Sequence, residues 1–272
     1  MRRAVIQFQI LPLHQILKTY DTYGYKFLVF TGDDHEATER KYIQELLSYK
    51  IEGMIILSHT IPSRKLASYN LPIVTIERED QFVNSVNTDN YMGALQATSL
   101  LIRDKCDILI HINVNVNKSA PAYDRIRAFQ ATCEEYHVPY DIDLSVKGDS
   151  YHELLDVIRE IFNKIESKYP DQKKGIFLAN DTYANMFLNL IFQKYGTFPS
   201  TYEIVGFDNS PIASEAILPI TTIGQQIDVI AKTAMDLLVQ QMEEQKKRVP
   251  KPLGEPIHKQ ITPILIRRNT TE

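Results

Sequence analysis

The feature that most constrains the fold is a set of three apolar runs in the second half of the chain, each followed by a polar residue. The expected strand Gly175–Ala179 leads into Asn180, Glu203–Phe207 into Asp208, and Thr221–Ile223 into Gly224 and Gln225. A helical stretch separates the first two runs, which predicts parallel strands with a right-handed crossover. Ligands of open parallel sheets bind beyond the carboxyl ends of the strands. We therefore expect these three polar side chains to share one site. None is an obvious nucleophile, which favours binding over catalysis.

Strand and helix patterns alternate along the whole chain, which predicts an α/β fold. The strands are rich in Val, Ile and Leu, as in parallel sheets that are buried on both faces. One sheet of ten strands would be unusually wide, so two sheets are expected, with a boundary near 87–90. The expected strands are Ala4–Phe8, Lys26–Phe30, Gly53–Leu57, Ile73–Ile76, Ser85–Asn87, Asp107–Ile112, Ile142–Val146, the three named above and Ile261–Ile266. The expected helices include Glu36–Tyr49, Tyr91–Arg103, Tyr151–Lys168, Tyr183–Tyr195 and Val229–Met242, and the Pro- and Gly-rich run Val249–Pro256 is expected to be a surface connection.

The composition excludes several classes of function. The 272 residues are 44% hydrophobic and carry a formal charge of −4, which suits polyanion binding poorly. Cys106 and Cys133 match no metal or redox spacing and are expected to be buried free thiols. His111 lies in an apolar run and is expected in the core. Because there is no glycine-rich phosphate loop, nucleophile elbow or metal-ligand spacing, we expect no cofactor, no metal ion and no enzymatic activity. No apolar run reaches membrane-spanning length and no secretory signal is recognisable, which predicts a cytoplasmic protein.

Arg125 is the cation that stands out near the expected site. It follows the strand Asp107–Ile112 after a polar loop and opens the next helix. A guanidinium group there offers planar paired donors suited to vicinal hydroxyls or a carboxylate. A surface arginine paired with Asp124 or a neighbouring acid is an equally weighted alternative.

Several of these segments, in order and in register, resemble the LacI/GalR family of transcriptional regulators. The matching segments are Val86–Ala94, Arg125–Phe129, Leu178–Asp181, Ile204–Asn209, Leu218–Gln225 and Leu265–Arg267. The resemblance spans nearly the whole chain. It implies the fold of type I periplasmic binding proteins, in which two doubly wound subdomains are joined by three crossing strands and the effector lies in the cleft. The implied subdomains are 1–88 with 226–262, and 89–225 with 263–272, and the implied crossings fall near Thr88, Gln225 and Thr262.

The resemblance also assigns residues to the effector site. It implies contacts from Glu77 and Thr88 of the first subdomain, from Arg125, Asn180 and Asp208 of the second, and from Gln225 at the hinge. Two departures from the family pattern matter for this assignment. The segment after the first strand is short, so Gln7 and Gln9 are weak candidates. Ser150 stands where an aromatic ring often stacks on the sugar, and Tyr151 is as well explained by a place on the helix surface.

The function that these expectations favour is the effector-binding and dimerisation core of a repressor that senses a sugar or sugar phosphate by closure of the cleft. The family's helix-turn-helix head is not recognisable before Ala4, so operator DNA would be bound only through a head absent from this chain. A solute-binding protein of a transporter is the alternative, and an enzyme on this fold is the third possibility. A homodimer is expected. Its candidate interface residues are Leu66, Tyr69, Ile212–Ile217, Met92, Leu95 and Gln96, although these could instead pack on their own sheets.

Overall fold

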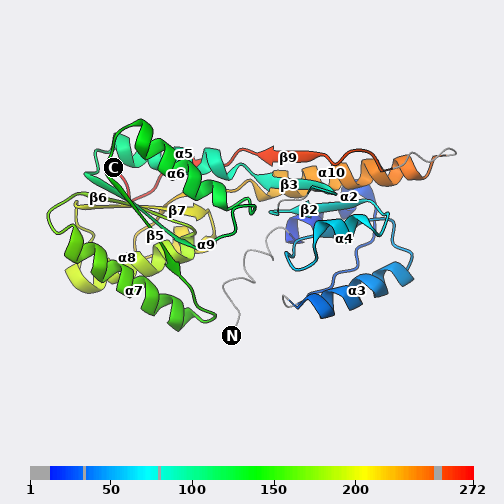
Figure 1. The fold of residues 1–272 in the computed structure, drawn as a ribbon, viewed down its shortest axis with the longest axis horizontal. Helices are drawn as coiled ribbons and strands as arrows, with labels where there is room; N and C mark the ends of the chain where they lie inside the picture. The colour runs from blue at the N-terminus through cyan, green and yellow to red at the C-terminus, as the bar shows by residue number, and fades with distance from the viewer. Residues whose placement is uncertain (1–12, 33–34, 79–80, 248–252) are drawn as a thin grey trace. The chain divides into compact units, whose positions relative to one another are not determined.

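A computed structural model describes residues 13–32, 35–78, 81–247 and 253–272 (Figure 1). Within these ranges the chain forms two compact units. The larger unit contains Asp89–Gln225 and Thr262–Glu272, and the smaller unit contains the described residues of 13–88 and 226–261. The chain therefore passes between the units after Thr88, Gln225 and Ile261.

The larger unit is built on a six-stranded sheet in the order β10-β8-β7-β6-β4-β5. Neighbouring strands are parallel except β10, which is antiparallel to β8. Since β6, β7 and β8 are adjacent and parallel, their carboxyl ends lie at one edge of the sheet. The strands are β4 (Ile108–Val114), β5 (Tyr140–Val146), β6 (Lys174–Leu178), β7 (Tyr202–Asp208), β8 (Thr221–Gly224) and β10 (Ile264–Ile266).

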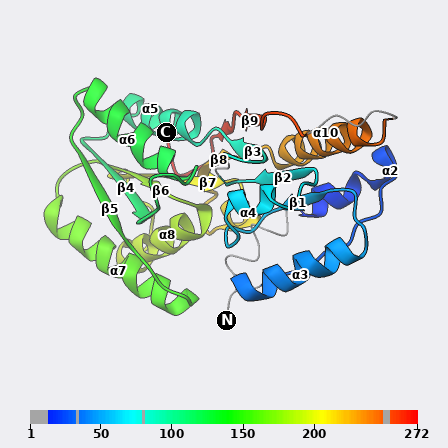
Figure 2. The ribbon, with the colours of Figure 1, turned by 45° about the vertical axis from the view of Figure 1, so that its right-hand side comes forward.

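Helices cover both faces of this sheet (Figure 2). On one face, α5 (Asn90–Arg103) and α6 (Tyr123–Glu135) enclose a core that includes the buried thiols Cys106 and Cys133. On the other face, α7 (Tyr151–Lys168) and α8 (Asp181–Tyr195) enclose a second core. The strands are thus buried on both sides, as their continuous apolar sequences predict. The short α9 (Pro211–Glu215) follows β7.

Polar side chains fix where these helices begin. Asp89 accepts a hydrogen bond from the backbone N–H of Met92 at 2.9 Å, and Asn180 accepts one from the N–H of Tyr183 at 2.9 Å. Such caps satisfy donors that the first turn of a helix leaves without a partner. At the other end of α8, Gly196 adopts φ +71°, a left-handed conformation that glycine adopts without a steric cost. Helix α8 therefore begins just beyond β6, and α5 begins just beyond β3 (Asn84–Thr88).

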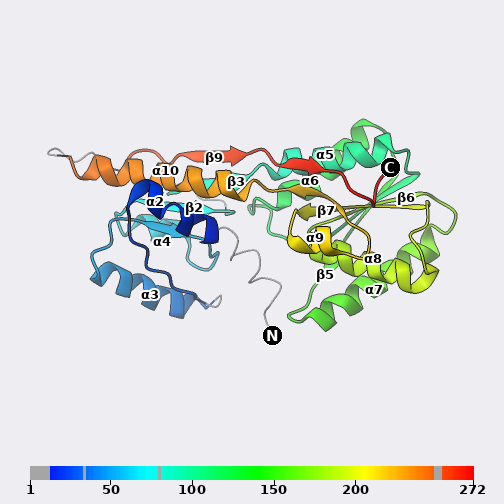
Figure 3. The ribbon, with the colours of Figure 1, turned by 180° about the vertical axis from the view of Figure 1, so that it is seen from behind.

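The smaller unit has a parallel sheet in the order β1-β2-β3-β9. Figure 3 shows β2, β3 and β9 of this sheet from behind. One face packs against the long α10 (Ile227–Gln245), and the other contributes to a core shared with α3 (Glu36–Ser48) and α4 (Ser63–Ala67). The short α2 (Tyr20–Tyr23) lies in the segment before the sheet. The strands are β1 (Met54–Ile56), β2 (Ile73–Ile76), β3 (Asn84–Thr88) and β9 (His258–Ile261).

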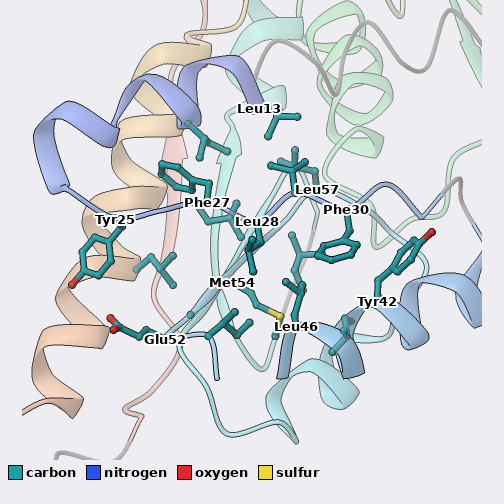
Figure 4. A pocket seen from close by; sticks show the side chains of 18 of the residues that line it. Leu13, Tyr25, Phe27, Leu28, Phe30, Tyr42, Leu46, Glu52, Met54 and Leu57 are labelled. Atoms are coloured by element: carbon teal, nitrogen blue, oxygen red, sulfur yellow. The ribbon is translucent and has the colours of Figure 1, made fainter. Parts of the chain in front are cut away.

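Two strand predictions are wrong. Lys26–Phe30 forms no ladder with another strand. A cavity of about 680 Å³ lies between this segment and β1, lined by apolar side chains such as Phe27, Leu28 and Met54 (Figure 4). Paired strands lie only about 4.8 Å apart, so a segment separated from β1 by this cavity is not paired with it. The single final strand Ile261–Ile266 is instead two strands, β9 and β10, which join different sheets.

Other expectations are met or fall outside the described residues. The α/β class with parallel sheets is confirmed. Ala4–Phe8, Gln7, Gln9 and most of the Pro- and Gly-rich run lie outside the described residues. Leu66 is fully buried in the core of its own unit, so its assignment to a dimer interface is wrong. Among the helices of the described residues, none combines the length and apolarity needed to span a bilayer.

Candidate functional site

Arg125 is held inside the larger unit. The residue is 9% exposed, although arginine is rarely so buried without partners. Nε donates to Oδ1 of Asn90 at 2.7 Å, and Nη1 donates to the carbonyl of Ala179 at 2.5 Å. Asp124 pairs instead with Arg127 at 3.0 Å. The alternative of a surface arginine paired with Asp124 is therefore wrong.

An aromatic ring fixes the plane of this guanidinium group. The Arg125 carbon Cζ lies 3.5 Å from the centre of the Phe207 ring. This stacking is a cation–π contact, and it leaves the edge of the planar fork to form hydrogen bonds. The fork points toward the next residue of β7, because Nη2 lies 4.0 Å from Oδ1 of Asp208. The neighbours Phe207 and Asp208 thus act on Arg125 together, one by stacking and one by charge.

Asp208 connects Arg125 to the end of the adjacent strand. Nε2 of Gln225, the residue after β8, donates to Oδ1 of Asp208 at 3.1 Å. Gln225 is 8% exposed, and its Oε1 is buried without a hydrogen-bond partner among the described residues. A buried amide oxygen without a donor is costly, and a hydroxyl of a bound molecule would satisfy it. The structure therefore brings Arg125, Asp208 and Gln225 together at the carboxyl edge of the sheet.

Asn180 lies at the same edge, after β6, where it also caps α8. Asn113 lies on β4, the strand beside β6, and was not among the residues predicted from the sequence. Its Nδ2 lies 3.1 Å from Nε2 of His111, and its Oδ1 accepts the N–H of Val114 at 2.8 Å. His111 is fully buried, as expected, and Nδ1 bonds the carbonyl of Phe177 at 2.9 Å. Burial lowers the pKa of His111 to about 3, so the ring is neutral near pH 7.

Glu77 and Thr88 form their own arrangement in the smaller unit. Oε1 of Glu77 accepts the N–H and the Oγ1 hydroxyl of Thr88, both at 2.6 Å. Glu77 has φ +55°, which is uncommon for a residue with a side chain. The structure thus pairs these two residues with each other. Their contribution to the same site as Arg125 stays a prediction.

Two further candidate residues, Ser150 and Tyr151, lie at the start of α7. Ser150 caps α7, where its Oγ accepts the N–H of Glu153 at 3.2 Å. Tyr151 is 49% exposed on the helix surface. Asn90 and Phe207, which hold Arg125, were not assigned to the site. Their positions beside Asp89 and Asp208 in the sequence segments are the signal that could have found them.

The chemistry of this edge is that of hydrogen-bond recognition. A guanidinium group, a carboxylate and an amide converge, and each can bond hydroxyl groups. No cluster of metal-ligating side chains occurs in the part of the chain that the structure describes. The 680 Å³ cavity of the smaller unit differs in kind, because its apolar lining offers few partners to a polyol.

Known proteins are similar to this chain in sequence and in architecture. Residues 100–271 match the model of the periplasmic binding protein-like domain. The ribose operon repressor of Halalkalibacterium halodurans is 27% identical over 250 residues, which are 92% of this chain and 71% of that protein. The sucrose operon repressor of Lactococcus lactis is 27% identical over 81% of this chain and 66% of its own length.

A solved structure agrees with the fold. A LacI family transcriptional regulator from Enterococcus faecalis with bound ribose superposes with a TM-score of 0.75 at 21% identity. The superposition covers 97% of this chain and 94% of that one. At this level of identity the likeness supports the architecture of both sheets, and the site must be argued from its own residues.

Proposed function

This chain belongs to the periplasmic-binding-protein-like family and is an effector-binding domain of the LacI/GalR type, and we propose that it senses a sugar or sugar phosphate for a transcriptional repressor. The observation that carries the proposal is the convergence of Arg125, Asp208 and Gln225 at the carboxyl edge of one sheet. A carboxylate and a guanidinium group in a partly desolvated site form strong hydrogen bonds with hydroxyl groups. The buried Oε1 of Gln225 adds an acceptor that a hydroxyl would satisfy.

The relatives favour a repressor over a transporter component. Those described above are named operon repressors, and the solved structure is named a transcriptional regulator. Ribose and sucrose are accordingly the first sugars to test on this chain. In this proposal the chain is a sensor without catalytic activity, and operator DNA would be bound by a separate head.

The proposed response is a change in the balance between two arrangements of the units. An effector that touched both units would favour one arrangement, and only to the extent that it bound that arrangement more tightly. Glu77 and Thr88 are the proposed contacts from the smaller unit. A homodimer would carry the change to two DNA-binding heads.

Calorimetric titration with D-ribose, sucrose and D-ribose 5-phosphate tests the proposal. Saturable binding of one sugar is expected, with affinity lost in Asp208→Ala. Energy transfer between dyes on the two units should change on addition of that same sugar. Binding that is unaffected by substitution at Asp208 would contradict the site assignment.

A further inference from the structure

Beneath the candidate site, Asp181 forms a buried anchor that the proposed function does not yet use. It is the first residue of α8 and is 1% exposed. Oδ2 accepts the N–H of Ser210 at 2.7 Å and its hydroxyl at 3.1 Å, and Oδ1 accepts the hydroxyl of Thr222 at 2.6 Å. Thr222 is itself fully buried on β8. One carboxylate therefore ties α8 and β8 to the turn that follows β7.

That turn has a backbone conformation that needs support. Asp208 has φ +104° and Asn209 has φ +54°, and neither is a glycine. Asp and Asn are the non-glycine residues that adopt positive φ most readily, but the φ of Asp208 lies outside the common left-handed region, so surrounding contacts must hold this turn. The N–H of Asn209 points to Oγ1 of Thr222 at 3.4 Å, and its Oδ1 accepts Nη2 of Arg268 at 2.7 Å. Asn209 and Ser210 are thus held by hydrogen bonds to Thr222, Arg268 and Asp181.

The sequence of β7 makes room for the anchor. A Cβ atom at Gly206 would lie 2.4 Å from Oδ1 of Asp181, closer than any real contact. Only glycine at 206 lets the carboxylate approach the strand and reach Thr222. The turn at 208–210, Gly206 and Asp181 are therefore in mutual contact. The turn begins with Asp208, whose carboxylate faces Arg125.

We propose that Asp181 is a positioning residue for effector binding, which holds the 208–210 turn so that the Asp208 carboxylate stays directed at Arg125 and Gln225. This inference rests on the proposed function, because it assumes that Asp208 binds the effector. Asp181 acts through the turn and does not itself contact the ligand.

The acidity of Asp181 supplies a distinctive signature. Burial raises its pKa to about 6, while hydrogen bonds from Thr222 and Ser210 and the charge of Arg268 oppose the rise. Arg268 is the charged group acting on it, and Asp208 lies on the turn that it holds. Protonation removes the charge of the carboxylate and turns one oxygen into a donor, so the charge-assisted bonds from Ser210 and Thr222 are weakened or rearranged. Effector affinity should therefore fall as the pH drops below about 6.

The contribution of Asp181 to fold stability has the opposite sign. Its folded pKa lies above its ordinary value of 3.8, so the folded state binds more protons between these pH values. That contribution decreases as the pH rises from about 4 to about 6. A merely structural Asp181 would therefore not weaken effector binding at low pH, whereas a positioning Asp181 would.

The test compares Asp181→Asn, Asp181→Ala and Thr222→Val with the unaltered chain. D-ribose, sucrose and D-ribose 5-phosphate are titrated by calorimetry at pH 7.5 and pH 5.5. We expect at least a tenfold loss of affinity in Asp181→Ala at pH 7.5 and a smaller loss in the two near-isosteric variants. The affinity of the unaltered chain should fall at pH 5.5, and that of Asp181→Asn should not change with pH. Ile191→Val, on the buried face of α8, should lower stability and leave affinity unchanged.

A second readout needs no sugar. Hydrogen exchange of the Ser210 amide should be slow in the unaltered chain and faster in Asp181→Asn. Unchanged exchange there, or unchanged affinity in all three anchor variants, would overturn the inference. Faster exchange without binding of any sugar would support the anchor and contradict the proposed function instead.

Discussion

Nη2 of Arg125 lies 4.0 Å from Oδ1 of Asp208, at the outer limit of an ion pair. A hydroxyl oxygen about 2.8 Å from each atom fits beside such a pair, accepting from the guanidinium group and donating to the carboxylate. The stacking of Arg125 on Phe207 keeps the guanidinium plane fixed while this happens. The spacing therefore suits a polyol better than a closed internal salt bridge would.

Replacing the carboxylate should weaken binding without unfolding the protein. Asp208→Ala should cost about 1.5–3 kcal/mol of effector binding energy, because charge-assisted bonds to hydroxyls are lost. Isothermal calorimetry measures this directly. Asp156→Ala is the matched control, since Asp156 is exposed on α7 and pairs only with Arg159 in the described structure. Equal affinity in the two variants would contradict the role of Asp208.

Arg125→Lys should lower effector affinity at least tenfold although the charge is kept. Lysine is a point charge and cannot stack on Phe207 while bonding both Asn90 and the carbonyl of Ala179. The control is Arg127→Lys on the same helix, whose arginine is exposed and pairs with Asp124. Calorimetry of both variants separates geometry from charge. Unchanged effector affinity in Arg125→Lys would show that a positive charge alone is sufficient for binding.

The stability of the fold should depend on pH through Glu203. This residue lies at the amino end of β7, opposite the end that carries Asp208. Burial raises the pKa of Glu203 from 4.5 to about 7, Asp104 adds to the rise, and the Lys173 ion pair opposes it. The folded state then binds more protons between these values, so the free energy of unfolding falls as the pH rises from about 5 to 7, by at most about 1.4 kcal/mol per pH unit.

Glu203→Gln should remove this part of the slope, and denaturant unfolding at several pH values measures it. Glu160→Gln, an exposed change on α7, should leave the curve unaltered. Identical slopes in the unaltered chain and Glu203→Gln would contradict the assignment.

Assembly is predicted to be dimeric. Light scattering at micromolar concentration should give twice the 31.4 kDa mass of the chain. Exposed apolar residues Met92 and Ile217 are candidates for the interface, at 37% and 64% exposure. Met92→Asp should weaken the dimer, whereas Tyr136→Asp, at the end of α6, should not. A monomer at these concentrations would argue against a symmetric interface, which should bury more than about 1,000 Å².

Much of the fold was predictable because apolar periodicity reports burial. Ile73–Ile76 is β2 and Tyr151–Lys168 is α7, with the expected bounds. The pattern could not show whether an apolar run has a strand beside it. Lys26–Phe30 has the composition of a strand, but a cavity separates it from β1. The division of the last strand likewise depends on which sheet each half joins, which is a tertiary property.

The positions of the candidate site residues were predictable where strand ends alone decide them. Asn180, Asp208 and Gln225 lie at the carboxyl ends of three adjacent parallel strands, so their shared edge follows from topology. The supports of the site were not predictable in this way. The contact of Phe207 with Arg125 and the anchor formed by Asp181 depend on distances between elements far apart in the sequence. Asp and Asn are the non-glycine residues most often found at positive φ, but the sequence alone does not show that both Asp208 and Asn209 adopt it.

The most direct test of the central claim is calorimetric titration of the intact chain with D-ribose, sucrose and D-ribose 5-phosphate. We predict saturable binding of at least one of them with a stoichiometry of about one per chain. Folding is verified in the same sample by circular dichroism. A folded protein that gives no binding heat and no thermal stabilisation with any of the three would contradict the proposal that this domain senses a sugar of these classes.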